Sequence, residues 1–426
     1  MAARTLAAVL VLLINILIAR VYGAEALGIL AIINSFILFA VLFAVLGLDT
    51  AILRLIPEHL VKHSTMSAYL VYRKSLSIIV CLSIVASTAV YLCAPVIAGS
   101  IFSKPQMASC FMLVALFLVF RSLMQFNTQA IRGLRLIRMF ALMFVMPHLF
   151  NLALLLVLSF FIHSQHVPVY ALLGSFALTG IVGWMVMEYR FRQIINPGDQ
   201  VRTMPYKEII SLSLPMVMTS AMTVIIGQTG IIMLGVFRPE HEAGYYSVAV
   251  NLATLTTFVL TAINSMSAPK FSELFHSGRL DELFQVARKA TRLIFWTTCP
   301  ILLFLAAFGN PLLSLLFGHD YTIVYGAMLL LVIGQFVNSI SGSTGIFMNM
   351  TGNQKAFRNI IASAAGINIL LNLLLTPSIG FTGAALSGMI SLIFWNFGAL
   401  LFMKLKYGQT IIYIPLLQGI KSDHKL

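Results

Sequence analysis

The chain has 426 residues, of which 60% are hydrophobic and 9% are charged, and its formal net charge at pH 7 is +14. Soluble globular chains are nearer half apolar and a quarter charged, so this composition excludes that class and predicts a polytopic membrane protein. The positive charge does not point to nucleic acid, because short loops beside membrane spans and their attraction to anionic headgroups account for basic residues.

Twelve apolar stretches follow one another along the chain and predict twelve transmembrane helices. Each is about 18 residues or longer, which lets a helix cross a hydrocarbon core of roughly 30 Å. The first stretch is interpreted as an uncleaved helix rather than a signal peptide, because the second follows it closely with no mature domain between them. The predicted spans are residues 5–22, 27–48, 75–102, 106–130, 139–162, 168–188, 209–236, 244–268, 292–317, 322–350, 357–377 and 381–403.

The positive charges fall almost entirely on one side of this pattern. When the loops alternate between two compartments, 24 of the 27 Lys and Arg residues fall in one, and Arg20, Lys104 and Arg238 fall in the other. Cytoplasmic loops retain Lys and Arg, while translocated short loops lose them. The sequence therefore predicts that both termini are cytoplasmic.

The twelve spans divide into two halves of six. A polar segment at 189–208 separates an N-terminal bundle at 1–188 from a C-terminal bundle at 209–403, and a cytoplasmic tail follows at 404–426. Three short motifs recur between the halves at offsets of 216, 212 and 219 residues, which pair Gly28 with Gly244, Pro57 with Pro269 and Gly133 with Gly352. An even number of spans separates the copies, so they share one orientation, and two such bundles would face each other across a central cleft.

The longest connections, 49–74, 189–208 and 269–291, all lie on the basic side. Within the last, apolar and charged residues of Phe271–Arg292 could form amphipathic helices on the inner surface, but a solvated connector is the favoured interpretation. The four cysteines lie within or at the ends of spans and lack metal-ligand spacing, which favours apolar packing: Cys81, Cys93, Cys110 and Cys299.

The deepest charges in the spans are cationic. All 13 acidic residues lie in loops or within about a turn of a helix end, so none is placed like a mid-membrane proton or cation site. The candidates for binding an anionic headgroup are Arg20, Arg54 and Arg121, with His148 as a fourth. Arginine binds phosphate oxygens bidentately and stays charged when partly desolvated. Snorkelling towards the headgroups is the alternative, and it is favoured for Arg20 and Arg54.

Amide side chains are common in the spans, and most are expected to bond between helices. The candidates for contacting sugar hydroxyls are Gln125, Gln129, Gln228, Asn251, Gln335 and Asn338. Tyr245 and Tyr246 could stack on a sugar face, although aromatic residues near a helix end are typical of interfacial anchors. Walker loops, dinucleotide fingerprints, zinc-protease motifs and nucleophile elbows are absent, so the sequence predicts no enzyme activity and no cofactor.

Two segments of the sequence resemble bacterial polysaccharide flippases, the Wzx-type branch of the multidrug/oligosaccharidyl-lipid/polysaccharide exporter superfamily with its MATE-like fold. One runs from Ile16 through Arg20 to Gly28 and continues at Gly47–Arg54. The other is Gly366–Ala385, where a helix ends before a Pro/Gly turn that opens the last helix. The likeness extends over all twelve spans, but its motifs are loose and identify a superfamily better than a substrate.

The resemblance implies an all-α fold of two pseudo-symmetric six-helix bundles in the bacterial inner membrane. It implies transport of an undecaprenyl-pyrophosphate-linked oligosaccharide, such as an O-antigen or other polysaccharide repeat unit, to the outer leaflet by alternating access. Membrane lipids and polysaccharide polymerase machinery would be the partners, and a cationic cavity would map onto Arg20, Arg54 and Arg121. Family members usually carry a longer segment before the first Ala-Arg motif, so the natural start is expected upstream and contacts from span one stay open.

Two other functions remain open at this point. A cation-coupled multidrug exporter of the same superfamily would share the fold but would want a carboxylate embedded in the membrane. A membrane enzyme of glycan assembly would be expected to carry a large translocated loop with catalytic residues, whereas the translocated loops here are short. The sequence also leaves open whether the membrane potential or an ion antiport energises transport.

Overall fold

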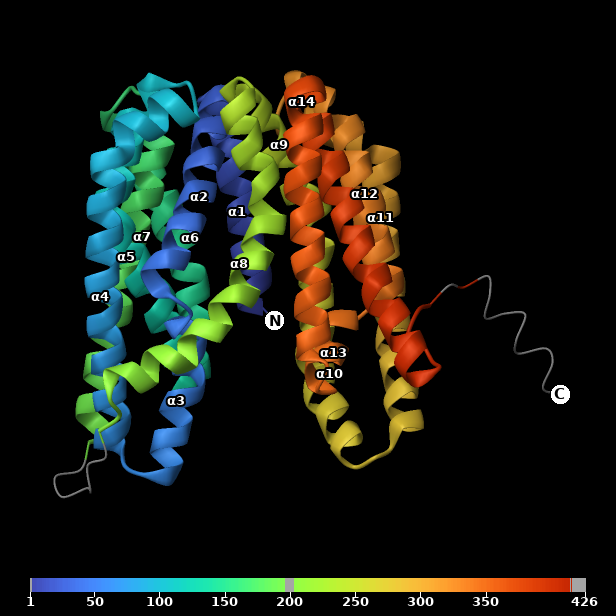
Figure 1. Cartoon of the computed structure of the whole chain (residues 1–426). Helices are drawn as coiled ribbons and strands as arrows, with labels where there is room; N and C mark the ends of the chain where they lie inside the picture. The colour runs from blue at the N-terminus through green and yellow to red at the C-terminus, as the bar shows by residue number, and fades with distance from the viewer. Residues whose placement is uncertain (1, 196–202, 414, 416–426) are drawn as a thin grey trace. The chain divides into compact units, whose positions relative to one another are not determined.

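The computed structural model describes residues 2–195, 203–413 and 415, which form helices and connecting turns without a strand (Figure 1). The described α-helices are α1 (Ala2–Val21), α2 (Gly23–Val45), α3 (Leu48–Lys62), α4 (Thr65–Val96), α5 (Ala108–Gly133), α6 (Ile137–Phe161), α7 (Val167–Ile194), α8 (Tyr206–Phe237), α9 (Glu240–Ala253), α10 (Thr256–His276), α11 (Leu280–Leu316), α12 (Tyr325–Ser341), α13 (Thr344–Met350) and α14 (Gln354–Tyr407). A π turn at Ile97–Ile101 and a 3₁₀ turn at Pro105–Met107 lie between α4 and α5, and a 3₁₀ turn at His319–Val324 lies between α11 and α12.

The helices confirm a polytopic membrane fold. Among the described residues, ten helices are long and apolar enough to span a membrane, and α9 with α10 passes the same test as a span bent by 43°. α14 contains two helices, because Ile379 and Gly380 have non-helical backbone angles in its middle. When α9 with α10 is counted as one span and α14 as two, the number of spans is twelve, as predicted.

One connection that was predicted as a loop contains a helix. α3 occupies residues 49–62 of the predicted connection 49–74. It buries one face against α4 and α5, made of Leu48, Ala51, Ile52, Leu55, Ile56 and His59. This spacing of three and four residues is that of a helix with one apolar side. The other side carries Arg54, Glu58 and Lys62, which kept the segment below the hydropathy of a span.

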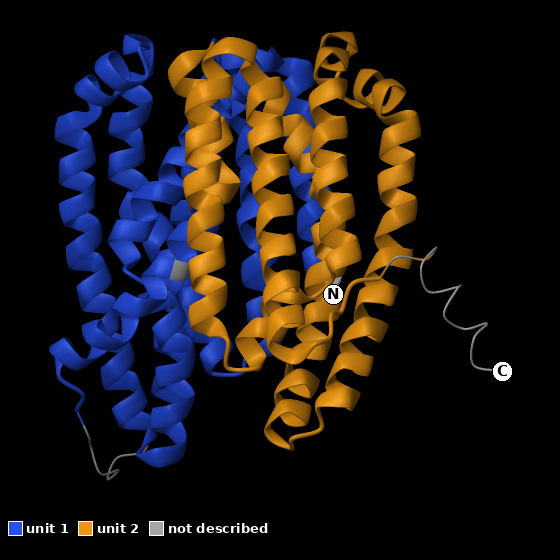
Figure 2. Cartoon of the chain, turned by 45° about the vertical axis from the view of Figure 1, so that its right-hand side comes forward, with its two compact units in different colours: residues 1–224, 239–244 blue, residues 225–238, 245–426 orange. Residues whose placement is uncertain are grey.

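The chain packs as two compact units (Figure 2). Unit 1 comprises residues 1–224 and 239–244, and unit 2 comprises residues 225–238 and 245–426. α9 therefore begins in unit 1 and continues in unit 2. The predicted linker 189–208 falls partly on 196–202 and the predicted tail 404–426 falls largely on 414 and 416–426, which lie outside the described residues.

The first turn of α9 is held within unit 1. A Cβ atom at Gly28 in α2 would overlap the carbonyl oxygen of Glu240 and would lie 3.1 Å from the backbone nitrogen of Gly244. Glu240 also lies 3.9 Å from the ammonium of Lys104 and accepts a hydrogen bond of 3.2 Å from Gln106. Both charged side chains of this ion pair are largely buried.

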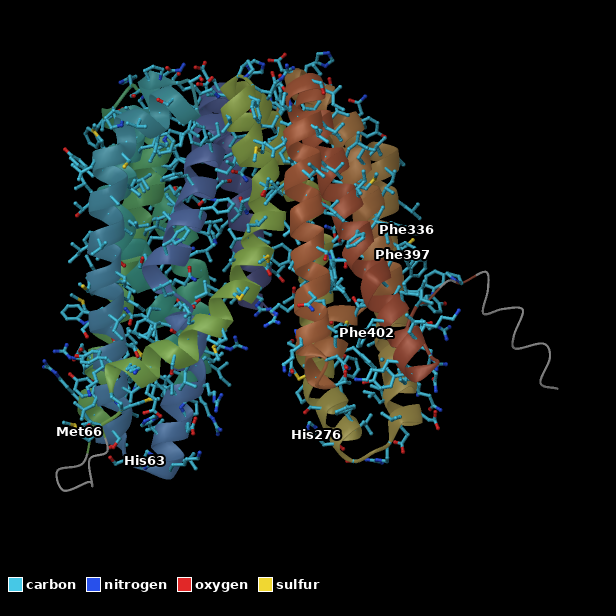
Figure 3. All side chains as sticks on the ribbon, viewed as in Figure 1. His63, Met66, His276, Phe336, Phe397 and Phe402 are labelled. Atoms are coloured by element: carbon cyan, nitrogen blue, oxygen red, sulfur yellow. The ribbon has the colours of Figure 1, made fainter. Side chains whose placement is uncertain are left out.

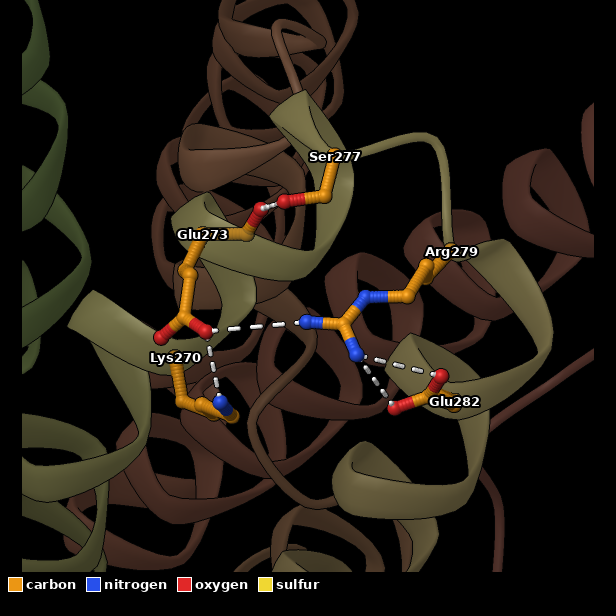
Figure 4. A network of polar contacts seen from close by, with 5 residues as sticks. All are labelled: Lys270, Glu273, Ser277, Arg279 and Glu282. Atoms are coloured by element: carbon orange, nitrogen blue, oxygen red, sulfur yellow. Dashed lines mark hydrogen bonds and ion pairs between the residues drawn. The ribbon is translucent and has the colours of Figure 1, made fainter.

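The turn between α10 and α11 in unit 2 shows what becomes of the predicted amphipathic segment. Phe271, Leu274, Leu283, Phe284 and Ala287 are buried, so the apolar residues pack inside the unit as extensions of the two helices. Ion pairs join the polar side chains across the turn, where Arg279 links Glu273 to Glu282 and Lys270 also contacts Glu273 (Figure 4). The segment is helical and its apolar residues are buried within the unit, so the favoured interpretation as a solvated connector is wrong.

The segment that follows α14 packs against helices of unit 2. The backbone N–H of Tyr413 donates to the carbonyl of Ile340, and its hydroxyl accepts from Trp296 at 3.1 Å. The Tyr413 ring packs on Phe295 and under the guanidinium of Arg292. Residues on the outer sides of α12 and α14, such as Phe336 and Phe397, are exposed as lipid-facing side chains would be (Figure 3).

Buried amides bond between the two helices of α14, as the sequence analysis expected. The Asn368 amide donates to Ser391 Oγ at 3.1 Å and to the carbonyl oxygen of Ser387 at 3.3 Å. Asn372 donates to Asn368, and Thr376 donates to Asn372 at 3.0 Å. This ladder joins the helices on both sides of the break at Gly380, since in lipid an unpaired polar group would be costly.

Candidate functional site

The break between α2 and α3 positions an acidic side chain within unit 1. Leu46 and Gly47 have φ angles of 44° and 71°, which end α2 and redirect the chain into α3. A Cβ atom at Gly47 would lie 2.6 Å from the carbonyl oxygen of Ser213, so glycine suits both the left-handed backbone and the close approach. Asp49 follows in the first turn of α3, where the positive end of the helix dipole favours a carboxylate.

Asp49 is linked to the deepest arginine through an amide. Arg121 and Gln125 are one turn apart on α5, so they share a face. Arg121 Nη1 donates to Gln125 Oε1 at 3.2 Å, and Gln125 Nε2 donates to Asp49 Oδ2 at 2.8 Å. The three side chains thus form a carboxylate–amide–guanidinium row, and each is only partly buried.

A tight contact between α5 and α7 completes this site. A Cβ atom at Gly180 would lie 2.6 Å from the carbonyl oxygen of Phe120, so glycine lets α7 approach α5 closely. Phe176, one turn earlier on α7, then lies with its ring 5.1 Å from the guanidinium carbon of Arg121. We call Asp49, Arg121, Gln125 and Phe176 the Arg121 cluster.

The chemistry of the cluster suits an anionic ligand. A guanidinium has five N–H donors in a fixed plane, and the bond to Gln125 uses one of them. The aromatic face of Phe176 stabilises the cation without neutralising it. Arg121 can therefore donate to phosphate oxygens from a partly desolvated position, where such bonds are stronger than in water.

The other predicted arginines lie away from the cluster. Arg20 is in the last turn of α1 next to the start of α2, whereas Asp49 follows the end of α2. The 23 residues of α2 separate the two positions by about 34 Å. Arg54 lies on the exposed side of α3, 3.5 Å from Glu58, which favours the surface alternative for this residue.

Two more predicted residues lie elsewhere in unit 1. Gln129 is one turn beyond Gln125 on α5, and its Oε1 atom is buried without a hydrogen-bond partner. His148 lies partly buried in the middle of α6. Gln129 therefore extends the polar face of α5 on which Arg121 and Gln125 lie.

The predicted amides of the second half lie in α8, α9 and α12. Gln228 and Asn251 are partly buried in α8 and α9. Asn338 donates to Gln335 at 3.3 Å and accepts from Asn396 at 3.2 Å, and Asn396 also accepts from Thr344. These bonds place Gln335 and Asn338 in a network that joins α12 to α13 and α14.

Tyr245 and Tyr246 have different surroundings in unit 2. Tyr246 is 5% exposed, packs against Gly230 and donates to the carbonyl oxygen of Ala384 at 3.4 Å, so it belongs to the interior of unit 2. Tyr245 meets the ring of Tyr321 edge to face at 5.1 Å. The structure thus gives Tyr246 a packing role rather than the position of a sugar-stacking ring.

Sequence reasoning missed Asp49 and Phe176 as members of the cluster. Asp49 was assigned to a loop, because the helical spacing of apolar residues in α3 was not recognised. That spacing, together with Gly47 just before it, is the signal that could have placed Asp49 at a helix start. Phe176 carried no such signal, since it is one of many aromatic residues in apolar spans.

Comparisons with known proteins bear on family and fold. A family described as "Polysaccharide biosynthesis protein" matches residues 17–325. An uncharacterised membrane protein of Methanocaldococcus jannaschii is 23% identical over 408 residues, which cover 92% of this chain and 80% of that protein. A probable low-salt glycan biosynthesis flippase of Haloferax volcanii is 24% identical over 162 residues, which cover 37% of this chain and 34% of that protein.

Solved structures show the same fold at low identity. The lipid II flippase MurJ, in an inward closed conformation, matches with a TM-score of 0.74 and 15% identity over 95% of this chain and 87% of that chain. An inward-facing multidrug resistance transporter of the MATE family matches with a TM-score of 0.71 and 13% identity, over 95% of this chain and 94% of that chain. These similarities confirm a MATE-like fold.

Proposed function

The chain belongs to the polysaccharide biosynthesis protein family, and from this premise we propose that it is a flippase for a lipid-linked oligosaccharide. The proposed substrate is an undecaprenyl-pyrophosphate-linked repeat unit of an O-antigen or another polysaccharide. The flippase would carry it from the inner to the outer leaflet of a bacterial inner membrane, for use by polymerase machinery. The relative described as a glycan biosynthesis flippase and the fold shared with a lipid II flippase support this assignment.

The Arg121 cluster is the observation that carries the proposal. A pyrophosphate needs donors that stay charged when partly desolvated, and a guanidinium in the middle of a spanning helix provides them. Arg121 is halfway along α5, on Phe176 and one turn from the amide of Gln125. Polar side chains such as Gln125 and Gln129 on the same helix face are suited to the sugar nearest the pyrophosphate.

The membrane potential can supply the direction of transport. By the positive-inside rule, the loops that carry most of the Lys and Arg residues would be cytoplasmic, and both termini with them. Moving about two negative charges outward across an inside-negative membrane releases roughly 5 kcal/mol per 100 mV if they cross the whole field. Two helical bundles that rock about a bound headgroup would couple this gain to alternating access.

A transport assay with defined variants tests the proposal. The full chain is reconstituted into liposomes with a fluorescently labelled polyprenyl-pyrophosphate oligosaccharide, and the label exposed to an outside reagent is followed over time. We expect Arg121→Ala to reduce the flipping rate by about tenfold or more, Arg121→Lys to recover part of it, and Arg54→Ala to stay near wild type. Flipping that is no faster than in empty liposomes would refute the assignment.

A multidrug exporter is the second candidate, and Asp49 is the observation that favours it. An exporter that exchanges cations is expected to carry a carboxylate embedded in the membrane; Asp49 is a partly buried carboxylate bonded to Gln125 of a spanning helix, and the fold also matches a multidrug transporter. The two functions differ in the charge of the cargo. Uptake of a cationic dye that Asp49→Asn abolishes, without flipping of the pyrophosphate lipid, would establish the exporter instead.

A further inference from the structure

We propose that Asp49 is an internal competitor of the transported anion: it accepts a hydrogen bond from Gln125, which accepts one from Arg121, and its negative charge limits how tightly a phosphate group is held. The inference rests on the proposed function, since it concerns the regulation of the same site. It assigns Asp49 a role in setting affinity and release rather than in binding the substrate directly.

The orientation of Gln125 supports this reading. Its N–H group faces the carboxylate of Asp49 and its carbonyl faces the guanidinium of Arg121. The reverse orientation would point N–H groups at a cation and a carbonyl at an anion. The amide is therefore polarised by opposite charges at its two ends, and it transmits the charge of Asp49 to Arg121 without direct contact.

An arriving phosphate would compete with Asp49 for the amide of Gln125, and it would bind the N–H donors of Arg121 that Gln125 does not use. A carboxylate only accepts hydrogen bonds, so Asp49 offers no donor to a phosphate and repels its charge. Gln125 has donors of its own and can turn its N–H groups from Asp49 to a phosphate oxygen. The hydrogen bond from Gln125 to Asp49 is therefore expected to break when a phosphate binds Arg121.

Such a competitor serves transport because a carrier must release what it binds. A site that conducts or carries an ion needs binding that is favourable enough for entry and weak enough for exit. An uncompensated arginine in a partly desolvated site would hold a pyrophosphate strongly. Asp49 lowers that affinity while leaving the guanidinium charged.

Pyrophosphate binding to the purified full chain in detergent tests the proposal directly. Inorganic pyrophosphate is the probe, and its dissociation constant is measured by calorimetry at low and at physiological salt. We expect Asp49→Asn to bind about tenfold more tightly than wild type, because the amide keeps a hydrogen-bond acceptor for Gln125 but removes the charge. Asp49→Glu keeps the negative charge, so it should bind pyrophosphate more weakly than Asp49→Asn does.

Glu58→Gln is the matched control. Glu58 is a carboxylate of the same helix, and it pairs with Arg54 and Lys62 on the exposed side of α3. Its loss removes the same formal charge but should leave the dissociation constant within about twofold of wild type, since exposed charges are screened by salt. Thermal unfolding of each variant confirms that the compared proteins are folded.

The outcomes separate this inference from the proposed function. If Asp49→Asn binds no more tightly while Arg121→Gln binds more weakly, Asp49 is a structural tie between α3 and α5 and the competitor role is wrong. If Arg121→Gln leaves binding unchanged, or if folded wild-type and Asp49→Asn proteins both fail to bind, the anion site itself is wrong and both proposals fall.

Transport kinetics give a second and independent readout. A competitor that aids release predicts that Asp49→Asn lowers the substrate concentration for half-maximal flipping and also lowers the maximal rate. A purely structural role predicts a loss of rate without a gain in apparent affinity. A maximal rate at or above wild type with unchanged apparent affinity would overturn the proposal.

Discussion

Gly28 and Gly244, which occupy matching positions in the two halves of the sequence, contact each other in the folded chain. The backbone nitrogen of Gly244 is 3.1 Å from where a Cβ atom of Gly28 would lie, and that of Gly28 is 3.0 Å from a Cβ atom at Gly244. The carbonyl oxygens of Ala24 and Glu240 occupy the remaining space. Both glycines are therefore required by the close approach of α2 and α9.

Alanine at either glycine should destabilise the protein. The added methyl group overlaps a backbone carbonyl, so the helices must separate, at a cost of about 3 kcal/mol, the upper end of overpacking. Thermal unfolding of Gly28→Ala in detergent measures the effect. Gly366→Ala in α14 is the control, because a Cβ atom there meets nothing within 4 Å. Equal midpoints for the two variants would contradict the contact.

The Lys104–Glu240 ion pair should give a pH-dependent stability. Burial lowers the pKa of Lys104, while Glu240 and Glu242 oppose that shift. A lysine whose pKa is lower in the folded state costs stability while it is protonated in both states, and the cost is relieved as pH rises through the lowered pKa towards 10.5. Glu240→Gln should therefore cost about 3 kcal/mol at pH 7, the lower end for one partner of a buried pair because Glu242 also acts on Lys104, and less near pH 10.

The control for that experiment removes both charges. Lys104→Met combined with Glu240→Gln leaves no buried ammonium, so its unfolding midpoint should lie closer to wild type than that of Glu240→Gln alone. A deficit in Glu240→Gln that stays constant from pH 7 to pH 10 would show that Lys104 is not the group responsible.

Tyr413 should hold the segment after α14 against α11 and α12. Its side chain is 6% exposed and packs on Phe295, so Tyr413→Ala is expected to cost about 3 kcal/mol. Tyr413→Phe loses only the bond to Trp296, which is worth about 1 kcal/mol. Tyr189→Ala, at a 61% exposed position on α7, should change the unfolding free energy by less than about 0.5 kcal/mol. If Tyr413→Ala destabilised the protein less than Tyr189→Ala does, Tyr413 would lie outside the packed structure.

Asn368 should be the most sensitive amide of the α14 ladder. Replacing it by leucine removes the donor to Ser391 and the acceptor for Asn372. Both of these buried side chains then lose their hydrogen bond to residue 368. We expect a loss of about 1–2 kcal/mol, since single bonds of this kind in membranes average about 0.6 kcal/mol. Ser378→Ala, which affects an exposed hydroxyl bonded to its own helix, should be near neutral. Similar midpoints for both variants would show that the ladder does not stabilise α14.

The spans were predictable because lipid imposes a simple rule. A segment that crosses hydrocarbon must satisfy its own backbone and must be apolar for its whole length, so composition alone reveals it. α3 does not cross, and only its periodic face marks it as a helix. The break in α14 was visible as a Pro/Gly turn, whereas the hydrogen bonds that join its two helices depend on which faces meet.

The candidate site was predictable only in part. Arg121 and Gln125 lie on one helix, so their spacing of four residues brings them together. Asp49 is 76 residues earlier and Phe176 is 51 residues later than Gln125, and no local pattern brings such residues together. The left-handed backbone at Leu46 and Gly47 sets the direction of α3, and the glycine at position 180 lets α7 pack closely on α5. Such geometric details become apparent only in the folded chain.

The first turn of α9 packs as part of unit 1, while its later turns pack as part of unit 2. α9 itself is one continuous helix from Glu240 to Ala253. Compliance is expected at residues 254 and 255, where α9 ends and the chain turns by 43° into α10. A change in the direction of the chain beyond α9 is therefore expected to alter the backbone at these two residues and to leave the helical hydrogen bonds of α9 intact.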